Sequence, residues 1–231
     1  MSNIVTVSFI IPTLNEEAVI RKTLECLQAE RANGHEVVLV DGGSQDQTIA
    51  LAQEYVDYTI QSAPGRSVQM NRGATVSQGD ILCFLHADTL TPKNCAAVIE
   101  EAIAKTGRPW GRFDVRLSGS HCAFRIIETM INVRSRLSGI ATGDQGIFVQ
   151  RAFFEQLGGF PVMLLMEDVQ FSKQAKVRSR PVCLSQHLVT SSRRWEQNGI
   201  FKTIWLMWRL RLAFYLGADP YQLAQRYRNT R

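Results

Sequence analysis

The chain has 231 residues, of which 45% are hydrophobic and 20% charged, and its formal net charge is +5. A chain of this length hides roughly 70% of its unfolded surface on folding, so we expect one domain that needs no disulfide or structural metal. The composition excludes intrinsic disorder, collagen-like repeats and a membrane protein with several spans. The mild basic charge favours an anionic ligand or surface, but it falls short of a nucleic-acid-binding arm, so no nucleic-acid partner is expected.

The cysteines and the N-terminus predict a cytoplasmic protein. The five cysteines are scattered and form no C-x-x-C pair, which is typical of reduced, mostly buried thiols. Residues 1–7 contain no Lys or Arg and no cleavage pattern follows, so no signal peptide is expected. The most apolar window, Ile200–Gly217, is interrupted by Lys202, Arg209 and Arg211, and we expect no membrane span.

The first half of the chain alternates short apolar runs with segments of helical periodicity. The apolar runs predict strands at Val5–Ile11, Val37–Val40, Tyr58–Gln61 and Ile81–Leu85. Helices are expected at about 19–27, 49–55 and 92–105, and the segment with Arg66, Gln69 and Asn71 is expected to be a loop. Repeated strand–helix units predict an α/β fold with a doubly wound, mostly parallel sheet flanked by helices.

The second half is less regular. Alternating or continuous apolar residues predict strands at 113–117 and 146–149, and helical periodicity predicts helices at 121–137, 151–157 and 169–177. We find no internal repeat, low-complexity tract or linker, so residues 1–231 are expected to form a single domain.

Acidic and polar residues follow three predicted strands. Pro12–Glu17 follows the first strand, Asp41–Ser44 the second and His86–Asp88 the fourth. The carboxyl ends of parallel strands meet at one edge, where ligands bind in open α/β sheets. Each group has a structural alternative: a turn at Asp41, a helix N-terminus at Glu16, a solvated strand end at His86. Their coincidence on one edge favours a binding site.

The residue types at this edge suit a nucleoside diphosphate with a metal ion. Mg²⁺ and Mn²⁺ prefer one or two carboxylates together with phosphate oxygens, which Asp88, with His86 beside it, could anchor. Asp41 could accept a hydrogen bond from a base or ribose. Arg66 suits a base or phosphate, because a guanidinium fork matches such oxygens.

Seven segments, in order, resemble family 2 glycosyltransferases. These segments are Ser8–Glu17, Val40–Thr48, Gln69–Gly73, Phe84–Thr89, Gly143–Gln145, Met166–Asp168 and Ser192–Trp195. The compact size and the His-Ala-Asp motif at 86–88 are similar to those of a small bacterial subgroup.

The resemblance implies a GT-A fold, a donor that is a nucleotide-diphosphate sugar (UDP- or GDP-linked), a divalent metal (Mn²⁺ or Mg²⁺) and inversion at the anomeric carbon. It further implies that the following residues bind the nucleotide-sugar: Pro12, Thr13, Glu16, Asp41, Arg66, Asn71, Asp88 and Arg194. Asp88 matches the last Asp of the family's Asp-x-Asp metal motif. The first Asp of that motif is replaced by His86, which leaves the metal affinity and the choice of metal open.

The resemblance also assigns residues to catalysis and to the acceptor. Asp168 matches the catalytic base, and Glu167 is the other candidate for that role. In the structural alternative, this acidic pair only begins a helix. Trp195 would stack on the acceptor, or it is a core residue, and Asp144 would contact the donor sugar or the acceptor. The expected division is a nucleotide-binding half at 4–118, an acceptor and catalytic half at 119–199, and a C-terminal helical tail at 200–231.

The tail, residues 200–215, is rich in aromatic residues. One interpretation is a helix docked on the domain or at a homodimer contact. The other is a peripheral helix on the inner face of the cell membrane, near a lipid-like acceptor, because Trp and Arg suit the interface.

Two alternative functions stay open beside sugar transfer. A sugar-nucleotide pyrophosphorylase needs a Gly-rich, basic loop after the first strand, where this chain has Pro12–Glu17. A non-catalytic nucleotide-sugar-binding module is favoured by His86 and disfavoured by the retained Asp88, Glu167 and Asp168.

Overall fold

The fold centres on one mixed sheet. A computed structural model describes residues 5–228, apart from the side chains of Arg194, Asn198 and Arg228. The strands of this part are β1 Val7–Thr13, β2 Glu36–Asp41, β3 Tyr58–Gln61, β4 Ile81–Phe84, β5 Thr89–Leu90, β6 Trp110–Leu117, β7 Ile147–Gln150 and β8 Val182–Thr190. Their order across the sheet is β3-β2-β1-β4-β7-β6-β8-β5.

The first four strands confirm the prediction of a parallel half. β1 pairs in parallel with both β2 and β4, and β2 pairs in parallel with β3. The second half is mixed: β7 is antiparallel to β4 and β6, whereas β6 and β8 are parallel. β8 was not expected, because exposed polar residues at 185–187 interrupt its apolar alternation.

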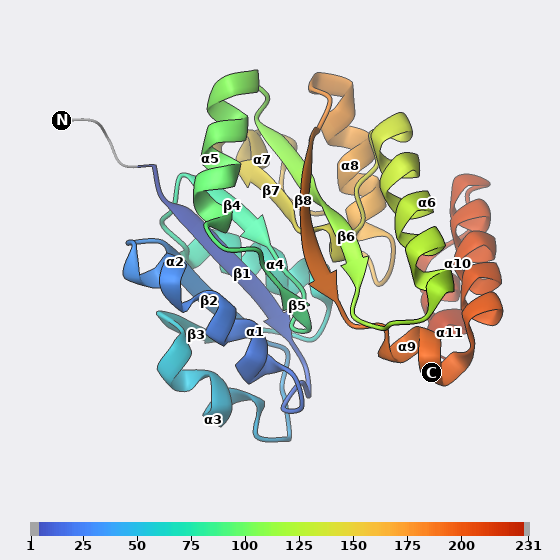
Figure 1. The fold of residues 1–231 in the computed structure, drawn as a ribbon, viewed down its shortest axis with the longest axis horizontal. Helices are drawn as coiled ribbons and strands as arrows, with labels where there is room; N and C mark the ends of the chain where they lie inside the picture. The colour runs from blue at the N-terminus through green and yellow to red at the C-terminus, as the bar shows by residue number, and fades with distance from the viewer. Residues whose placement is uncertain (1–4, 229–231) are drawn as a thin grey trace.

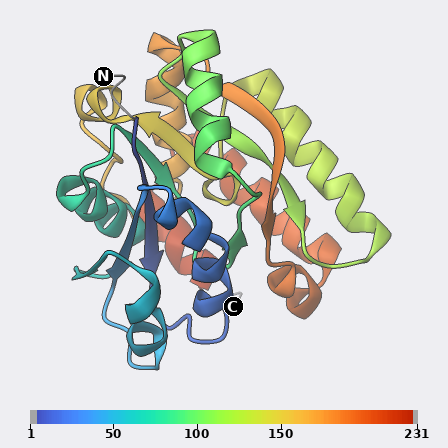
Figure 2. The ribbon, with the colours of Figure 1, turned by 60° about the vertical axis from the view of Figure 1, so that its left-hand side comes forward.

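Helices cover both faces of this sheet (Figures 1 and 2). Their bounds are α1 Ile20–Cys26, α2 Gln28–Ala32, α3 Thr48–Ala52, α4 Arg66–Val76, α5 Cys95–Thr106, α6 Cys122–Ser138, α7 Arg151–Leu157, α8 Glu167–Arg178, α9 Arg193–Asn198, α10 Ile200–Tyr215 and α11 Pro220–Arg228, with short 3-10 turns η1 Gln53–Tyr55 and η2 Gly143–Gln145. Buried side chains of α1, α3 and α5 pack on one face of the central strands, and those of α4, α7 and α8 pack on the other. Two buried faces explain why the central strands are apolar throughout.

Helix α4 corrects the expected loop around Arg66, Gln69 and Asn71. The helix buries few large apolar side chains and instead lies very close to the sheet. A Cβ on Gly73 would come within 2.4 Å of Cγ2 of Ile10 and 3.0 Å of Cγ2 of Val40. Close backbone packing therefore replaces the apolar stripe that usually reveals a helix.

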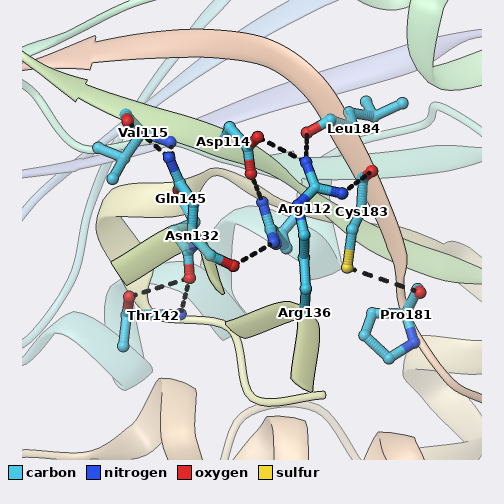
Figure 3. A network of polar contacts seen from close by, with 10 residues as sticks. All are labelled: Arg112, Asp114, Val115, Asn132, Arg136, Thr142, Gln145, Pro181, Cys183 and Leu184. Carbon is cyan, nitrogen blue, oxygen red and sulfur yellow. Dashed lines mark hydrogen bonds and ion pairs between the residues drawn. The ribbon is translucent and has the colours of Figure 1, made fainter. Parts of the chain in front are cut away.

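A polar network joins α6 to β6 and β8 (Figure 3). Asp114 on β6 forms ion pairs with Arg112 on the same strand and with Arg136 on α6. The side chain of Asn132 donates to the carbonyl of Val115 at 3.1 Å and accepts from its amide at 2.9 Å. α6 is thus fixed by charge pairing and by strand-like hydrogen bonds.

The C-terminal helices α10 and α11 pack beside α6 and α8. Leu210 and Leu223 form a small buried cluster with Ile140, Met166 and Val169. No helix in residues 5–228 combines the length and the hydropathy that crossing a bilayer requires.

The cysteines are all free thiols. The expectation that most of them are buried is wrong, because only Cys83 and Cys95 are fully buried, whereas Cys26 and Cys122 are exposed. The exposed pair lie on α1 and α6, on the outer sides of helices rather than in the core.

Candidate functional site

The first part of the site lies where β1 and β2 end. Thr13 is paired with Asp41 across these strands, so both reach the same edge of the sheet. Asp41 is fully buried, and its Oδ2 accepts hydrogen bonds from the amides of Gly43 at 2.8 Å and Ser44 at 2.9 Å. Oδ1 accepts from the Ser44 hydroxyl at 2.5 Å. The carboxylate therefore holds the turn in shape, as in the structural alternative given for Asp41 above.

The loop after β1 is fastened to the loop after β2. The amide of Glu16 donates to Oγ1 of Thr48 at 2.8 Å, and the amide of Glu17 donates to Asp46 at 3.1 Å. Pro12 and Glu16 are partly exposed beside the contact between these two loops. The four predicted nucleotide-binding residues from these strands therefore lie on one connected rim.

Arg66 and Glu167 bring α4 and α8 together at the same edge. Each is the first residue of its helix, and Nη1 of Arg66 lies 3.6 Å from Oε1 of Glu167. Glu167 is only 3% exposed, and burial raises the pKa of its carboxyl, with the Arg66 cation opposing that rise. Met166, just before Glu167, has φ +69°, a left-handed conformation that turns the chain sharply into the helix.

His86 and Asp168 meet at Gly143. A Cβ on this glycine would lie 2.6 Å from Nε2 of His86, so a side chain here would collide with the imidazole, and it would lie in ordinary contact, at 3.7 Å, with Oδ2 of Asp168. The Gly143 amide donates to Oδ2 of Asp168 at 2.7 Å, and the Val169 amide donates to Oδ1 at 2.7 Å. Nε2 of His86 is buried without a partner, and burial, then the Arg66 cation, lowers the pKa of this imidazole well below its usual value.

Asp88 lies just beyond β4, half-buried. Burial raises the pKa of its carboxyl; the cations of Arg193 and Arg66 oppose that rise, and Asp144 adds to it. Two arginines and a second carboxylate therefore surround the predicted metal-binding residue.

The metal prediction is compatible with these residues. Within the described residues, no three His, Cys, Asp or Glu side chains are grouped so that they could hold a cation by themselves. Mg²⁺ and Mn²⁺ do not need such a cage when a diphosphate supplies oxygens. Asp88 offers a carboxylate, and His86, neutral at pH 7 because its pKa is lowered, offers an unpartnered nitrogen.

Two of the remaining predicted residues, Asn71 and Trp195, are engaged elsewhere. Both amide atoms of Asn71 bond the backbone of Phe160, at 2.8 and 2.9 Å, and so tie α4 to the turn before α8. Trp195 on α9 is partly buried against Leu117, Phe124 and Ile127. The side chain of Arg194 lies outside the described atoms. Asp144 stands in η2, and its Oδ1 is buried without a partner.

One narrow pocket brings the central residues together. It is lined by Arg66, Met70, Phe84, Leu85, His86, Gly143, Ile147, Phe160, Glu167 and Asp168.

Sequence reasoning missed Arg193, whose charge acts on Asp88, because two adjacent arginines at 193–194 cannot be told apart by pattern. The sequence pattern also did not single out Arg134, whose Nε and Nη2 atoms are buried without a hydrogen-bond partner, because it lies in mid-helix among other arginines of α6.

The arrangement of the sheet and helices is a GT-A fold. The Staphylococcus aureus TarS 1-349 structure in complex with UDP-GlcNAc matches with a TM-score of 0.68 and 20% identity, over 80% of this chain and 58% of that chain. Glucosyl-3-phosphoglycerate synthase from Mycobacterium tuberculosis, in complex with Mn²⁺, UDP and glucosyl-3-phosphoglycerate, matches with a TM-score of 0.57 and 16% identity, over 79% of this chain and 70% of that chain.

The model of glycosyl transferase family 2 matches residues 8–149, and the chain belongs to this family. The probable glycosyltransferase YdaM of Bacillus subtilis is 26% identical over 250 residues, which cover 94% of this chain and 56% of that protein. The PGL/p-HBAD biosynthesis glycosyltransferase of Mycobacterium bovis is 38% identical over 88 residues, 35% of this chain and 34% of that protein. The chain thus spans about half or less of the length of these relatives.

Proposed function

We propose that the protein is an inverting glycosyltransferase that moves a sugar from a nucleotide-diphosphate sugar to a hydroxyl-bearing acceptor. The observation that carries this proposal is the pocket at which Asp168, Glu167, Arg66 and His86 converge beside the strand ends. Family membership and the nucleotides named in the solved neighbours support it.

Asp168 is the better candidate for the general base. An inverting transfer needs a carboxylate that takes the proton of the attacking hydroxyl as the bond to the sugar forms. Asp168 is partly exposed in the pocket, and its two backbone hydrogen bonds fix its orientation. Glu167 is buried, has a raised pKa and faces Arg66, so its proposed role is to hold that guanidinium in place.

The donor would lie along the rim formed by Pro12, Thr13, Glu16 and Asp41, in the half of the chain spanning 4–118. Arg66 and Arg193 supply positive charge near Asp88, where the diphosphate would bind. Mg²⁺ or Mn²⁺, held by Asp88 and His86, would neutralise the charge on the leaving diphosphate. Residues 119–199 would contribute the base and the acceptor side, including Asp144 and Trp195.

The donor proposal predicts a thermal shift that depends on both nucleotide and metal. UDP-, GDP- and dTDP-sugars would each be added with Mn²⁺, Mg²⁺ or EDTA. A ligand at a hundredfold excess over its Kd stabilises the native state by about 2.7 kcal/mol, which raises the Tm by about 5–10 °C for a chain of this size. Asp88→Ala is expected to abolish the metal-dependent part of the shift.

Two controls accompany that experiment. Glu155→Gln removes an exposed carboxylate on α7 and should leave the shift unchanged. Nucleotide binding without any release of nucleoside diphosphate would favour the non-catalytic binding module. No shift with any nucleotide would contradict the donor proposal.

Contact with a membrane is a further part of the proposal, and α10 and α6 support it. The exposed apolar side chains of α10 recur at helical spacing and are 55–85% exposed: Phe201, Trp205, Trp208, Leu212 and Tyr215. α6 carries a second exposed stripe, namely Ile126, Met130, Val133 and Leu137. The two helices share a buried cluster and lie side by side (Figure 1). α10 has three basic residues and no acidic one, which favours an anionic bilayer at the inner face of the membrane.

The membrane proposal predicts flotation with vesicles. The protein is expected to float with phosphatidylglycerol-containing vesicles and much less with pure phosphatidylcholine. A Trp205→Ser, Trp208→Ser double variant should lose most of this binding, because Trp side chains anchor at the interface. Val177→Ser, at a position 83% exposed on α8, is the matched control. If these Trp substitutions instead convert a dimer to a monomer in sedimentation, the stripes form a homodimer contact and the membrane proposal is wrong.

A further inference from the structure

Arg134 is a half-buried cation, and two of its guanidinium nitrogens have no hydrogen-bond partner. It lies on α6, and the charges of Arg211 and Tyr215 on α10 act on it. Its Nε and Nη2 atoms are buried, and neither has a hydrogen-bond partner among the described residues. Buried polar groups are nearly always hydrogen-bonded, so two such N–H groups on one guanidinium indicate a missing partner.

The charges around Arg134 belong to the proposed catalytic centre. The pKa of the Arg134 guanidinium is lowered to about 10: burial and then the charge of Arg211 on α10 lower it, whereas Asp144, Asp168 and Tyr215 oppose the change. In residues 5–228, Arg134 forms no ion pair within 4.0 Å, and Arg211 makes no hydrogen bond or ion pair. Two cations therefore lie near each other without the direct partner that would offset their repulsion.

The carboxylates nearby do not fill this role. Oδ1 of Asp144 is itself buried without a partner, and both oxygens of Asp168 accept backbone amides. A cation that merely balanced these acids would be expected to bond one of them directly. The unused donors of Arg134 and the unused acceptor of Asp144 therefore belong to one group of interacting charges that also includes Asp168.

We propose that Arg134 and Arg211 bind a phosphate group of the acceptor, and that this places the acceptor hydroxyl at Asp168. The proposal rests on the proposed function, because it names the class of acceptor for that same site. A phosphate monoester carries nearly two negative charges at pH 7, and guanidinium groups match its oxygens with paired N–H donors. Oδ1 of Asp144 remains free to accept a hydrogen bond from a second hydroxyl of the acceptor.

The phosphate could belong to a soluble phosphate ester or to a lipid headgroup. The two sources share the chemistry that Arg134 recognises. They differ in whether binding is measured with the free ester or with a vesicle surface. Inorganic phosphate and glycerol 3-phosphate test the soluble source, and vesicles that contain phosphatidic acid, whose headgroup is a phosphate monoester, test the lipid source.

The test is a phosphate titration followed by Tm, at constant ionic strength set with NaCl, with and without UDP. Wild-type protein is expected to show a saturable rise in Tm with inorganic phosphate that adds to the rise caused by UDP. Arg134→Gln should abolish the phosphate effect, and Arg211→Gln should weaken it at least tenfold. Arg72→Gln, at an exposed position on α4, should leave it unchanged.

The outcomes separate this proposal from the donor proposal. If phosphate competes with UDP and still binds the Arg134→Gln variant, it binds in the donor site, and the inference is overturned. The absence of any effect of phosphate on the Tm also overturns it. A phosphate effect lost in Arg134→Gln, in a protein that never responds to UDP, supports the subsite and contradicts the donor proposal. The Arg134→Gln variant lacks a charge whose buried nitrogens have no partner, so its Tm without ligand should equal or exceed that of wild type. If the Arg134→Gln variant fails to fold, the Arg211→Gln variant provides the test.

Discussion

Replacing Asp168 with Asn is expected to slow the release of nucleoside diphosphate from the sugar donor by about 10²–10⁴-fold, the usual contribution of a general base. The change is nearly isosteric. The side-chain oxygen of Asn can still accept the hydrogen bond that Asp168 now accepts from the Gly143 amide at 2.7 Å. The substitution removes the ability to take a proton, together with the hydrogen bond that Oδ1 now accepts from the Val169 amide. The rate should be measured at saturating donor, so that kcat and donor binding are separated.

A second variant, Glu167→Gln, distinguishes the role of Glu167 from that of Asp168. Glu167 is buried and faces Arg66 at 3.6 Å, so its neutral form is expected to weaken donor binding more than kcat. The donor-induced thermal shift should therefore stay intact in Asp168→Asn and shrink in Glu167→Gln. A large loss of kcat in Glu167→Gln, with Asp168→Asn near wild type, would reverse the assignment of the base.

Asp114→Asn is expected to destabilise the protein by about 3–5 kcal/mol, because removing one partner of a buried ion pair leaves an uncompensated charge. Arg112 is fully buried, and Asp114 is its charge partner on β6. The same carboxylate also holds Arg136 of α6, at 2.5 Å (Figure 3). Urea unfolding should show a lower midpoint with an unchanged slope.

Two variants test the cause of that loss. Glu155→Gln removes an exposed carboxylate and should change stability by less than about 0.5 kcal/mol. The double variant Arg112→Met, Asp114→Leu removes the buried pair together and should recover much of the lost stability, because the desolvation of both charges is also removed. A double variant as unstable as Asp114→Asn would mean that shape, not charge, determines the stability of this region.

The first half of the fold could be predicted because its signals are local. Strands buried on both faces read as unbroken apolar runs, and Val37–Val40 and Ile81–Phe84 are fully buried. The glycines and acidic residues come directly after these strands in the sequence. The sheet edge with Asp41, His86 and Asp88 could therefore be predicted from the sequence.

The order of residues along the chain is enough to predict the parallel half-sheet, the edge on which the polar residues gather, and the acidic pair at 167–168. Tertiary packing is needed to show that α4 is a helix, that β8 joins the sheet, and which arginines lie near the acidic residues of the candidate site. α4 packs through Gly73 rather than through an apolar stripe, so its periodicity is weak. Arg134 and Arg193 resemble their neighbours in sequence, and what distinguishes them is burial and the charge of residues distant along the chain. Periodicity reports which face of an element is buried, whereas a binding site depends on which side chains from separate elements meet, and that is set by packing.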